Sequence, residues 1–470
     1  MRSYIMTIRV LMKRYMKGVN KMTKAAFIGF GEVNTPKELI IEKCRKAEDS
    51  LLKEGIELIS IYPVTDDYER SDVNKAIESL VSQSFQTVIL CIAGWIPSHA
   101  VISITERFKD TPMVLWGLSG WMEKDRIVTT ADQAATSAIR KVMSDLGYKF
   151  KFVYEIVGKP LNSKKIADFC KASDAMFKLK SSRAGMMGYR DMNLYGTMFD
   201  GVKLKRHIGT DIECFEILEV EQRAVSISKT RIQEVIHNEI EKWKFLKSCD
   251  SVTKEKAARY YLAISDICKE RGYEAVSLKD VDGMKKLLSY PPAPIFMLLS
   301  DIDKLCTIPE NDSYGMVTQL MVKYLTGQCG AYLEFYEFME DCVLAGVPDY
   351  IPKEITQGDT VVIPAAFGQL SEGILNVSSV KPGNVILYRL SQNKEGYCMH
   401  IVKGRAETAD KWEEAGWTQP APQLPGLMIY LDDVETFAMN VMSQHYIIAY
   451  EDNADKMVDL CKLLNIEVVR

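Results

Sequence analysis

Short apolar runs alternate with longer amphipathic segments from residue 24 to about residue 160 of the chain. Continuous apolar runs typical of buried strands occur at residues 25–30, 56–60, 87–93, 113–118 and 150–157. Amphipathic helical spacing occurs between them, at residues 72–84, 97–108 and 130–146. At residues 35–38, threonine as N-cap, proline at the first helical position and a following glutamate predict a capping box that opens another helix. Strands and helices that alternate through short connections predict parallel pairing, and therefore an open α/β sheet.

The alternation continues from residue 161 to about residue 354 and predicts a second α/β unit. Helices are predicted at residues 163–180, over a long charged stretch at 219–270, and at 313–325. Strands are predicted at residues 183–188, 211–217 and 295–299. The last of these runs follows Tyr290-Pro-Pro-Ala-Pro, which interrupts the helical pattern.

After residue 355 the helical periodicity disappears, and Gly, Pro, Val and Thr become frequent. Strands of an antiparallel barrel or sandwich are predicted at residues 361–364, 373–377, 384–390, 396–402 and 427–431. A helix at residues 453–464 and a strand at 466–469 complete the pattern. The predicted fold class is α/β, with two Rossmann-like open parallel-sheet domains followed by a C-terminal antiparallel β-barrel domain. The predicted limits are 1–22 for a basic N-terminal extension, then 23–160, 161–354 and 355–470 for the three domains.

Composition narrows the class of protein. The 470 residues include 59 Lys and Arg against 63 Asp and Glu, a formal charge of −4 that gives no reason to expect a nucleic-acid or membrane-surface partner. No apolar run approaches the roughly 18 residues of a membrane-spanning helix. The 11 cysteines contain no CxxC pair, which favours reduced thiols in a cytoplasmic protein and excludes a paired-cysteine zinc site.

The first 22 residues carry basic side chains and no acidic ones, which is compatible with an organelle-targeting peptide. A disordered extension upstream of the folded protein is favoured, because the segment leads directly into the first predicted strand.

The five histidines differ in their surroundings. His99 follows the third predicted strand, near the end where open α/β sheets bind ligands. His207 and His237 lie among charged residues and are predicted to be solvated, whereas His400 alternates with apolar residues and is predicted to be structural. His445 directly precedes a predicted strand, where a lone histidine is ordinarily a core residue.

Two carboxylates change the interpretation of His445. Glu310 lies in a loop before the helix predicted at 313–325, and Glu334 lies in a possible strand between Tyr332 and Tyr336. A buried carboxylate is costly unless it is paired, hydrogen-bonded or metal-bound. The alternative is that Glu334 belongs to a solvated acidic helix face with Glu337. The motifs GxxxxGK[ST], GxSxG and HExxH are absent, which leaves metal-assisted chemistry on a small polar substrate or a binding protein without chemistry.

Several stretches, in the same order, make the chain from residue 22 similar to the L-fucose/L-arabinose isomerase family. In the first domain they are Pro36-Lys-Glu-Leu and Cys91-Ile-Ala-Gly-Trp, and in the second Met186-Met-Gly-Tyr-Arg-Asp-Met and the segment 199–209. The carboxylate segments are Pro309-Glu-Asn-Asp-Ser-Tyr-Gly and Tyr332-Leu-Glu-Phe-Tyr. The C-terminal stretches are residues 380–390 and Gln444-His-Tyr.

The resemblance implies an aldose–ketose isomerase that works through a cis-ene-diol. It implies that Glu310 and Glu334 are catalytic, metal-binding acids and that His445 is a metal ligand. Mn²⁺ is the expected cofactor, with Mg²⁺ or Co²⁺ as alternatives. Trp95 is a candidate wall against the sugar, or else a core tryptophan. Val347 stands where the arabinose isomerase branch has a further ligand histidine. The fucose isomerase branch uses an acid, acid, histidine trio, so this departure argues against specificity for arabinose and not against metal binding.

The same resemblance implies a cytoplasmic homo-oligomer, a hexamer with active sites at subunit boundaries. Two alternatives stay open. The substrate is a modified hexose, for example a sulfonated sugar or another deoxy-sugar, or the chain is a non-catalytic sugar-binding protein on the same scaffold.

Overall fold

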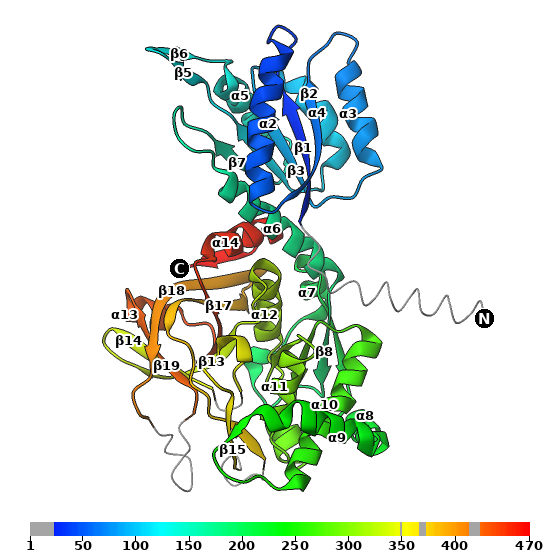
Figure 1. Ribbon diagram of the computed structural model, residues 1–470, viewed down its shortest axis with the longest axis vertical. Coiled ribbons are helices and arrows are strands. Elements are labelled where there is room, and N and C mark those ends of the chain that lie inside the picture. The colour runs from blue at the N-terminus through cyan, green and yellow to red at the C-terminus, as the bar shows by residue number, and fades with distance from the viewer. Residues whose placement is uncertain (1–22, 348–349, 366–372, 413–423) are drawn as a thin grey trace, which may run out of the picture. The chain divides into compact units, whose positions relative to one another are not determined.

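A computed structural model describes residues 23–347, 350–365, 373–412 and 424–470 (Figure 1). The predicted N-terminal extension lies outside the described residues. The chain divides into two compact units, Met1–Asp174 and Ala175–Arg470, and each is described by itself.

The first unit is built on a five-stranded parallel sheet of order β2-β1-β3-β4-β7. Its strands are β1 (Lys24–Phe30), β2 (Glu57–Val64), β3 (Thr87–Ile92), β4 (Met113–Gly117) and β7 (Phe150–Tyr154). The helices are α2 (Lys37–Lys53), α3 (Ser71–Val81), α4 (Ser98–Thr105) and α5 (Asp132–Asp145), and β5 (Trp121–Glu123) and β6 (Arg126–Val128) form a separate hairpin. Strands β3 and β4 are buried along their whole length, as continuous apolar runs predict. The predicted parallel α/β sheet is therefore confirmed.

The predicted capping box at the start of α2 is wrong. Pro36, with a ψ of 125°, is the N-cap residue, and no side chain donates or accepts a capping bond there. Thr35 therefore lies one residue before the cap, where its hydroxyl is not the helix-capping group.

The second unit begins with a parallel sheet of order β12-β11-β8-β9. Its strands are β8 (Arg183–Met187), β9 (Asp211–Phe215), β11 (Ala275–Leu278) and β12 (Cys306–Ile308). The accompanying helices are α6 (Ser163–Ser181), which crosses the boundary between the units, α7 (Gly201–His207), α8 (Ile217–Ser226), α9 (Lys229–Asn238), α10 (Ser251–Arg271), α11 (Ala293–Asp301) and α12 (Ser313–Thr326). Apolar side chains of α10 and α11 form one core with β11.

Two predictions in this region need correction. The stretch 219–270 is not one helix, because Ser228 caps α9 by accepting from the Arg231 amide at 3.4 Å, and Asp250 caps α10 by accepting from the Thr253 amide at 2.8 Å. The apolar run 295–299 is part of helix α11 and not a strand. A fully buried helix has no polar face, so a short apolar run cannot separate it from a buried strand.

Six antiparallel strands close into a barrel of order β17-β20-β13-β14-β19-β18, and the pairing of β17 with β18 completes the ring. They are β13 (Ala331–Phe338), β14 (Cys342–Gly346), β17 (Gly383–Gln392), β18 (Tyr397–Thr408), β19 (Gly426–Leu431) and β20 (His445–Tyr450). Strand β21 (Glu467–Val469), which follows α14 (Ala454–Leu464), runs parallel to β18. The predicted C-terminal barrel is confirmed.

Two of the predicted barrel strands belong elsewhere. Strands β15 (Val361–Pro364) and β16 (Ile374–Asn376) pair with β10 (Lys244–Phe245) in a separate three-stranded sheet. The barrel instead contains β13 and β14, which come before the predicted start of the C-terminal domain at residue 355.

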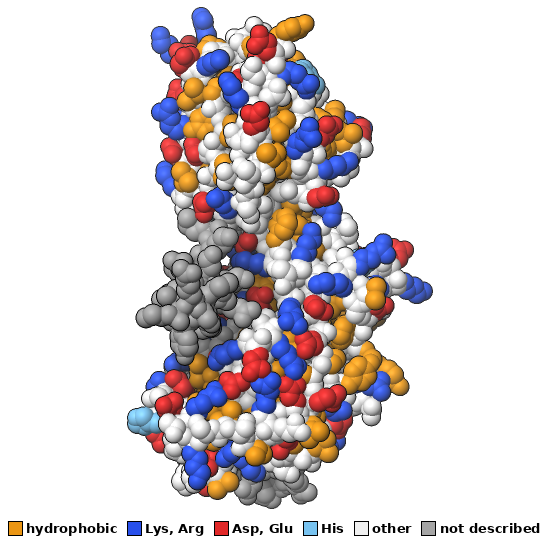
Figure 2. Space-filling view, turned by 90° about the vertical axis from the view of Figure 1, so that its right-hand side faces the viewer, with side chains coloured by type: hydrophobic (Ala, Val, Ile, Leu, Met, Phe, Trp, Pro, Cys, Tyr) orange, Lys and Arg blue, Asp and Glu red, His pale blue; other side chains and the backbone are white. Residues whose placement is uncertain are grey.

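The exposed side chains agree with the balanced composition. On the face in Figure 2, Lys and Arg side chains are interspersed with Asp and Glu. Within the described ranges, no helix combines the length and the apolar character needed to cross a bilayer. All eleven cysteines are free, and all but Cys214 and Cys249 are buried.

Buried His400 makes stability depend on pH. Its Nδ1 lies 2.7 Å from the Tyr446 hydroxyl, and burial lowers the pKa of His400 to about 4. The unfolded chain keeps the ordinary pKa of about 6.5 and binds more protons between these values. The free energy of unfolding should therefore fall as the pH drops from about 6.5 to about 4, by up to about 3 kcal/mol from this residue.

Urea unfolding of a His400→Phe variant over this pH range checks the expectation. The variant should lose less stability on acidification than the wild type. His237→Phe, which alters a side chain that is 83% exposed, should retain the wild-type dependence. Equal slopes for wild type and His400→Phe would contradict the assignment.

Candidate functional site

Three acidic side chains follow neighbouring strands of the second parallel sheet. Asp191 follows β8, Asp280 follows β11, and Glu310 follows β12. The carboxyl ends of parallel strands lie at one edge of the sheet, which is where open α/β sheets place ligands. The sheet thus brings three carboxyl groups from distant parts of the sequence to one edge.

The barrel contributes the second half of the cluster. Glu334 of β13 and His445 of β20 are directly opposite each other in the antiparallel register. Side chains at such positions lie on the same face of the sheet, roughly 5 Å apart at Cβ. Tyr332 lies two residues before Glu334 on this face, and its ring stacks on His445 with the centroids 4.3 Å apart.

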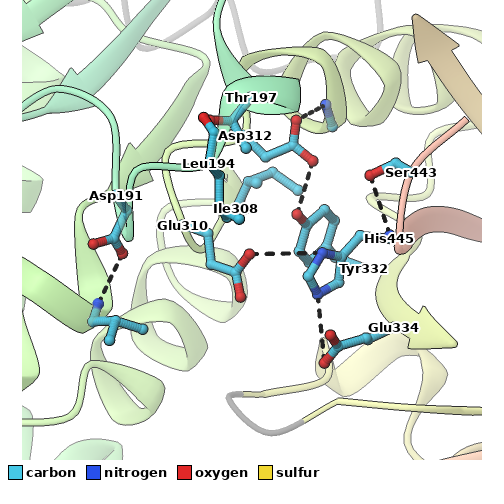
Figure 3. A network of polar contacts seen from close by, with 12 residues as sticks. Asp191, Leu194, Thr197, Ile308, Glu310, Asp312, Tyr332, Glu334, Ser443 and His445 are labelled. Atoms are coloured by element: carbon cyan, nitrogen blue, oxygen red, sulfur yellow. Dashed lines mark hydrogen bonds and ion pairs between the residues drawn. The ribbon is translucent and has the colours of Figure 1, made fainter. Parts of the chain in front are cut away.

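The two halves meet at the imidazole of His445 (Figure 3). Its Nδ1 lies 3.7 Å from Oε2 of Glu310, and its Nε2 lies 3.9 Å from Oε2 of Glu334. The side chains of His445 and Glu310 are 4% and 10% exposed, whereas that of Glu334 is 28% exposed. Of these three side chains, Glu334 therefore has the largest solvent-exposed fraction.

His445 is neutral in this environment. Burial lowers the pKa of its imidazole to about 3, and the charge of Arg389 acts in the same direction. The opposing effect of the buried carboxylates does not compensate. A neutral imidazole has a lone pair on one ring nitrogen, so it can accept a proton or bind a cation.

The loop that carries Glu310 has an unusual backbone conformation. Glu310 and Asn311 have φ angles of +61° and +50°, in the left-handed region that non-glycine residues seldom adopt. The Glu310 amide donates to Oδ1 of Asp280 at 2.7 Å, and the Asn311 side-chain amide donates to the Met187 carbonyl at 2.9 Å and to that of Tyr189. These bonds, from the ends of two other strands, hold Glu310 in place despite the strain.

Asp280 and Asp191 are buried carboxyl groups that support the loop carrying Glu310. Asp280 is fully buried and forms an ion pair with Lys285, at 3.0 Å, within the π-helical turn Asp280–Lys285. Burial and the charge of Asp280 raise the pKa of Asp191 to about 7. Asp191 accepts hydrogen bonds from the amides of Val281 and Asp282 at 2.9 and 2.8 Å. These bonds join the loop after β8 to the π-helical turn.

A buried ion pair between Arg389 and Asp312 holds Tyr332, which stacks on the His445 ring. Arg389 of β17 binds both oxygens of Asp312, and the Tyr332 hydroxyl donates to Oδ2 of Asp312 at 2.8 Å. Asp312 also caps α12 by accepting from the Gly315 amide at 3.0 Å. A Cβ at Gly315 would approach both Asp312 and Tyr332 to 2.8 Å, so glycine is required there. Tyr332 is thus fixed between Asp312 and the His445 ring.

The metal ion that the resemblance implies has suitable donors here. Two carboxylates and a neutral imidazole are a donor set that Mn²⁺ and Mg²⁺ accept. In the part of the chain that the structure describes, however, no three His, Cys, Asp or Glu side chains are arranged as a metal-binding group. Glu310 and Glu334 lie beside different nitrogens of His445, whereas a single metal ion would bond to only one nitrogen of the ring. The donors fit by type, but they are not a preformed coordination sphere.

The other residues singled out in the sequence are Trp95, His99 and Val347. Trp95 belongs to the first unit, where it follows β3 and is 40% exposed. His99 is exposed at the start of α4, and Val347 is buried next to β14. The acidic helix face considered for Glu334 does not exist, because residues 331–338 form a strand.

Sequence reasoning did not single out Asp191, Asp280, Asp312 or Arg389. The signal for Arg389 is a single charge in an otherwise apolar strand, since a buried guanidinium needs a carboxylate partner. Asp312 directly precedes a predicted helix, as N-cap residues do.

Comparisons with known proteins add no assignment to this geometry. The chain matches no model of a known protein family. It also matches no curated protein. The functional interpretation therefore depends on the site itself and on the motifs that resemble the isomerases.

Proposed function

We propose that this protein is a metal-assisted aldose–ketose isomerase, similar in its chemistry to L-fucose isomerase. The observation that carries the proposal is the meeting of Glu310, Glu334 and His445 from three separated segments, with contacts of 3.7 and 3.9 Å. These are the residues that the motif resemblance singles out.

The reaction needs a group that removes a proton from one sugar carbon and a group that returns it to the neighbouring carbon. Glu310 and Glu334, which lie beside different nitrogens of the His445 ring (Figure 3), supply two such groups. General acid–base catalysis of this kind contributes on the order of 10²–10⁴-fold. When bound, a divalent cation supplies Lewis-acid stabilisation of the negative charge that develops on the sugar oxygens.

The charges around the site favour a cation. The connected side chains include five carboxyl groups and two cationic groups: Asp191, Asp280, Glu310, Asp312, Glu334, Lys285 and Arg389. Lys285 forms an ion pair with Asp280, and Arg389 forms one with Asp312. The His445 ring, which contacts both Glu310 and Glu334, is neutral and adds no positive charge, so carboxyl groups outnumber cationic groups in this cluster.

Metal removal should abolish isomerisation. The purified protein is treated with a chelator, dialysed, and assayed for ketose formation from L-fucose, L-arabinose and a sulfonated hexose. We expect turnover of at least one aldose, its loss on chelation, and its return with Mn²⁺, because the donor set suits this ion.

Two results would contradict the proposal. Undiminished turnover after exhaustive metal removal would exclude metal-assisted chemistry. Calorimetric sugar binding without interconversion, in the presence of Mn²⁺, would identify a binding protein. If only the sulfonated hexose were converted, the proposed reaction would stand and the substrate would be a modified hexose.

A further inference from the structure

A cysteine lies shortly before each of the two site carboxylates in the sequence. Cys306 is the first residue of β12 and precedes Glu310 by four positions. Cys329 lies just before β13 and precedes Glu334 by five positions. Helix α12 connects the two segments. The Cys329 thiol lies 3.9 Å from the carbonyl oxygen of Leu305, the residue directly before Cys306, which places it beside the Cys306 segment.

Cys329 borders a large cavity. The cavity has a volume of about 600 Å³ and is lined by Cys329, Lys304, Lys323 and Glu354, among others. Cys329 is 7% exposed, and its amide donates to Glu354 at 2.6 Å. Cys306 is fully buried and does not line the cavity. A small polar oxidant in the cavity therefore meets Cys329 first.

The pKa values of the two thiols shift in opposite directions. The neighbouring Cys306 thiol, together with the charge of Lys323, lowers the pKa of Cys329. Burial raises the pKa of Cys306 well above its ordinary value. Oxidant-sensitive cysteines are accessible thiolates, frequently beside a second thiol that resolves the first oxidation product.

A second thiol pair in the chain provides an internal comparison. Cys44 and Cys91 of the first unit also influence each other's ionisation, but neither has any exposed surface. Burial raises the pKa of Cys91 well above its ordinary value. Cys44 and Cys91 are thus also close to each other, but solvent reaches neither thiol.

We propose that Cys306 and Cys329 form a peroxide-sensitive dithiol site, in which Cys329 reacts first and Cys306 resolves the product to a reversible disulfide. This disulfide joins the segment leading to Glu310 to the strand that carries Glu334. The oxidant is a hydroperoxide small enough to enter the cavity.

Atoms and electrons balance over two steps. The Cys329 thiolate attacks one peroxide oxygen, the O–O bond breaks, and the sulfenic acid of Cys329 and one water form after protonation. The Cys306 sulfur then attacks the Cys329 sulfur, the S–O bond breaks, and a second water leaves. Two thiols are oxidised to one disulfide, and one hydrogen peroxide is reduced to two waters.

Mass spectrometry of the full-length protein tests the proposal. After brief exposure to hydrogen peroxide and a non-reducing digest, we expect a cross-linked peptide containing Cys306 and Cys329, which dithiothreitol returns to the free thiols. In Cys306→Ser, the reaction should stop at the Cys329 sulfenic acid, which dimedone captures. In Cys329→Ser, both the cross-link and the adduct should be lost.

Cys44 and Cys91 serve as the matched control, and should stay reduced under the same treatment. Absence of the Cys306–Cys329 cross-link in the wild type, at a peroxide dose that oxidises exposed Cys214, would overturn the proposal. Equally fast cross-linking of Cys44 to Cys91 would also overturn it, because access through the cavity would then be irrelevant. The readout is a mass and does not depend on the proposed isomerase activity.

Discussion

Glu310→Gln and Glu334→Gln are each expected to reduce ketose formation at least about 100-fold, the lower end of the general acid–base contribution. Glutamine keeps the size of the side chain but neither accepts a proton in this role nor carries the charge that holds a cation. His445→Ala should have an effect of the same order, because it removes the imidazole that both carboxylates contact. Initial rates with the Mn²⁺-loaded protein, together with circular dichroism to establish folding, measure the effect.

Matched variants separate the site from its surroundings. Glu337→Gln alters an exposed carboxylate on the same strand as Glu334, and His237→Ala alters an exposed histidine. Both should retain wild-type rates. A folded Glu310→Gln or Glu334→Gln protein with the wild-type rate would remove that carboxylate from the mechanism.

Much of the secondary structure was predictable because burial in a parallel sheet leaves a clear pattern. Residues 88–92 and 113–116 are apolar at every position, and all of them are buried, as expected for a strand sandwiched between helices. The same criterion failed at 295–299, because α11 is also buried on all sides. Strands β15 and β16 were recognised but placed in the wrong sheet, since pairing partners are decided by tertiary contacts that a local pattern does not encode.

The site was predictable only in part. The motifs single out Glu310, Glu334 and His445, and the fold brings one carboxylate oxygen of each glutamate to within 4 Å of the imidazole. The residues that hold these three in place could not be predicted from the sequence, because each of them acts through a partner that is far away in the sequence. Asp280 receives the amide of Glu310, and Arg389 binds Asp312 across 77 positions. Such pairs become visible only when the sheet and the barrel are placed together.

The same buried pair leads to the largest expected effect on stability. Arg389 and Asp312 are 2% and 1% exposed, and Arg389 binds both carboxylate oxygens of Asp312. Burial alone would raise the pKa of Asp312, but Arg389 and the hydrogen bonds from Gly315 and Tyr332 hold it below its ordinary value. Arg389→Met should therefore lower the free energy of unfolding by about 3–5 kcal/mol, because it leaves a buried carboxylate without its counterion.

Urea unfolding at neutral pH measures the loss, and two further variants establish its cause. Arg405→Met removes the arginine of a pair with Glu407 that is 57% and 47% exposed, and should cost no more than about 1 kcal/mol. Adding Asp312→Asn to Arg389→Met removes the carboxylate that has lost its counterion, so the double variant should be more stable than Arg389→Met alone. If the double variant were instead less stable by the sum of the two single effects, the cost would come from lost packing and capping and not from an uncompensated charge.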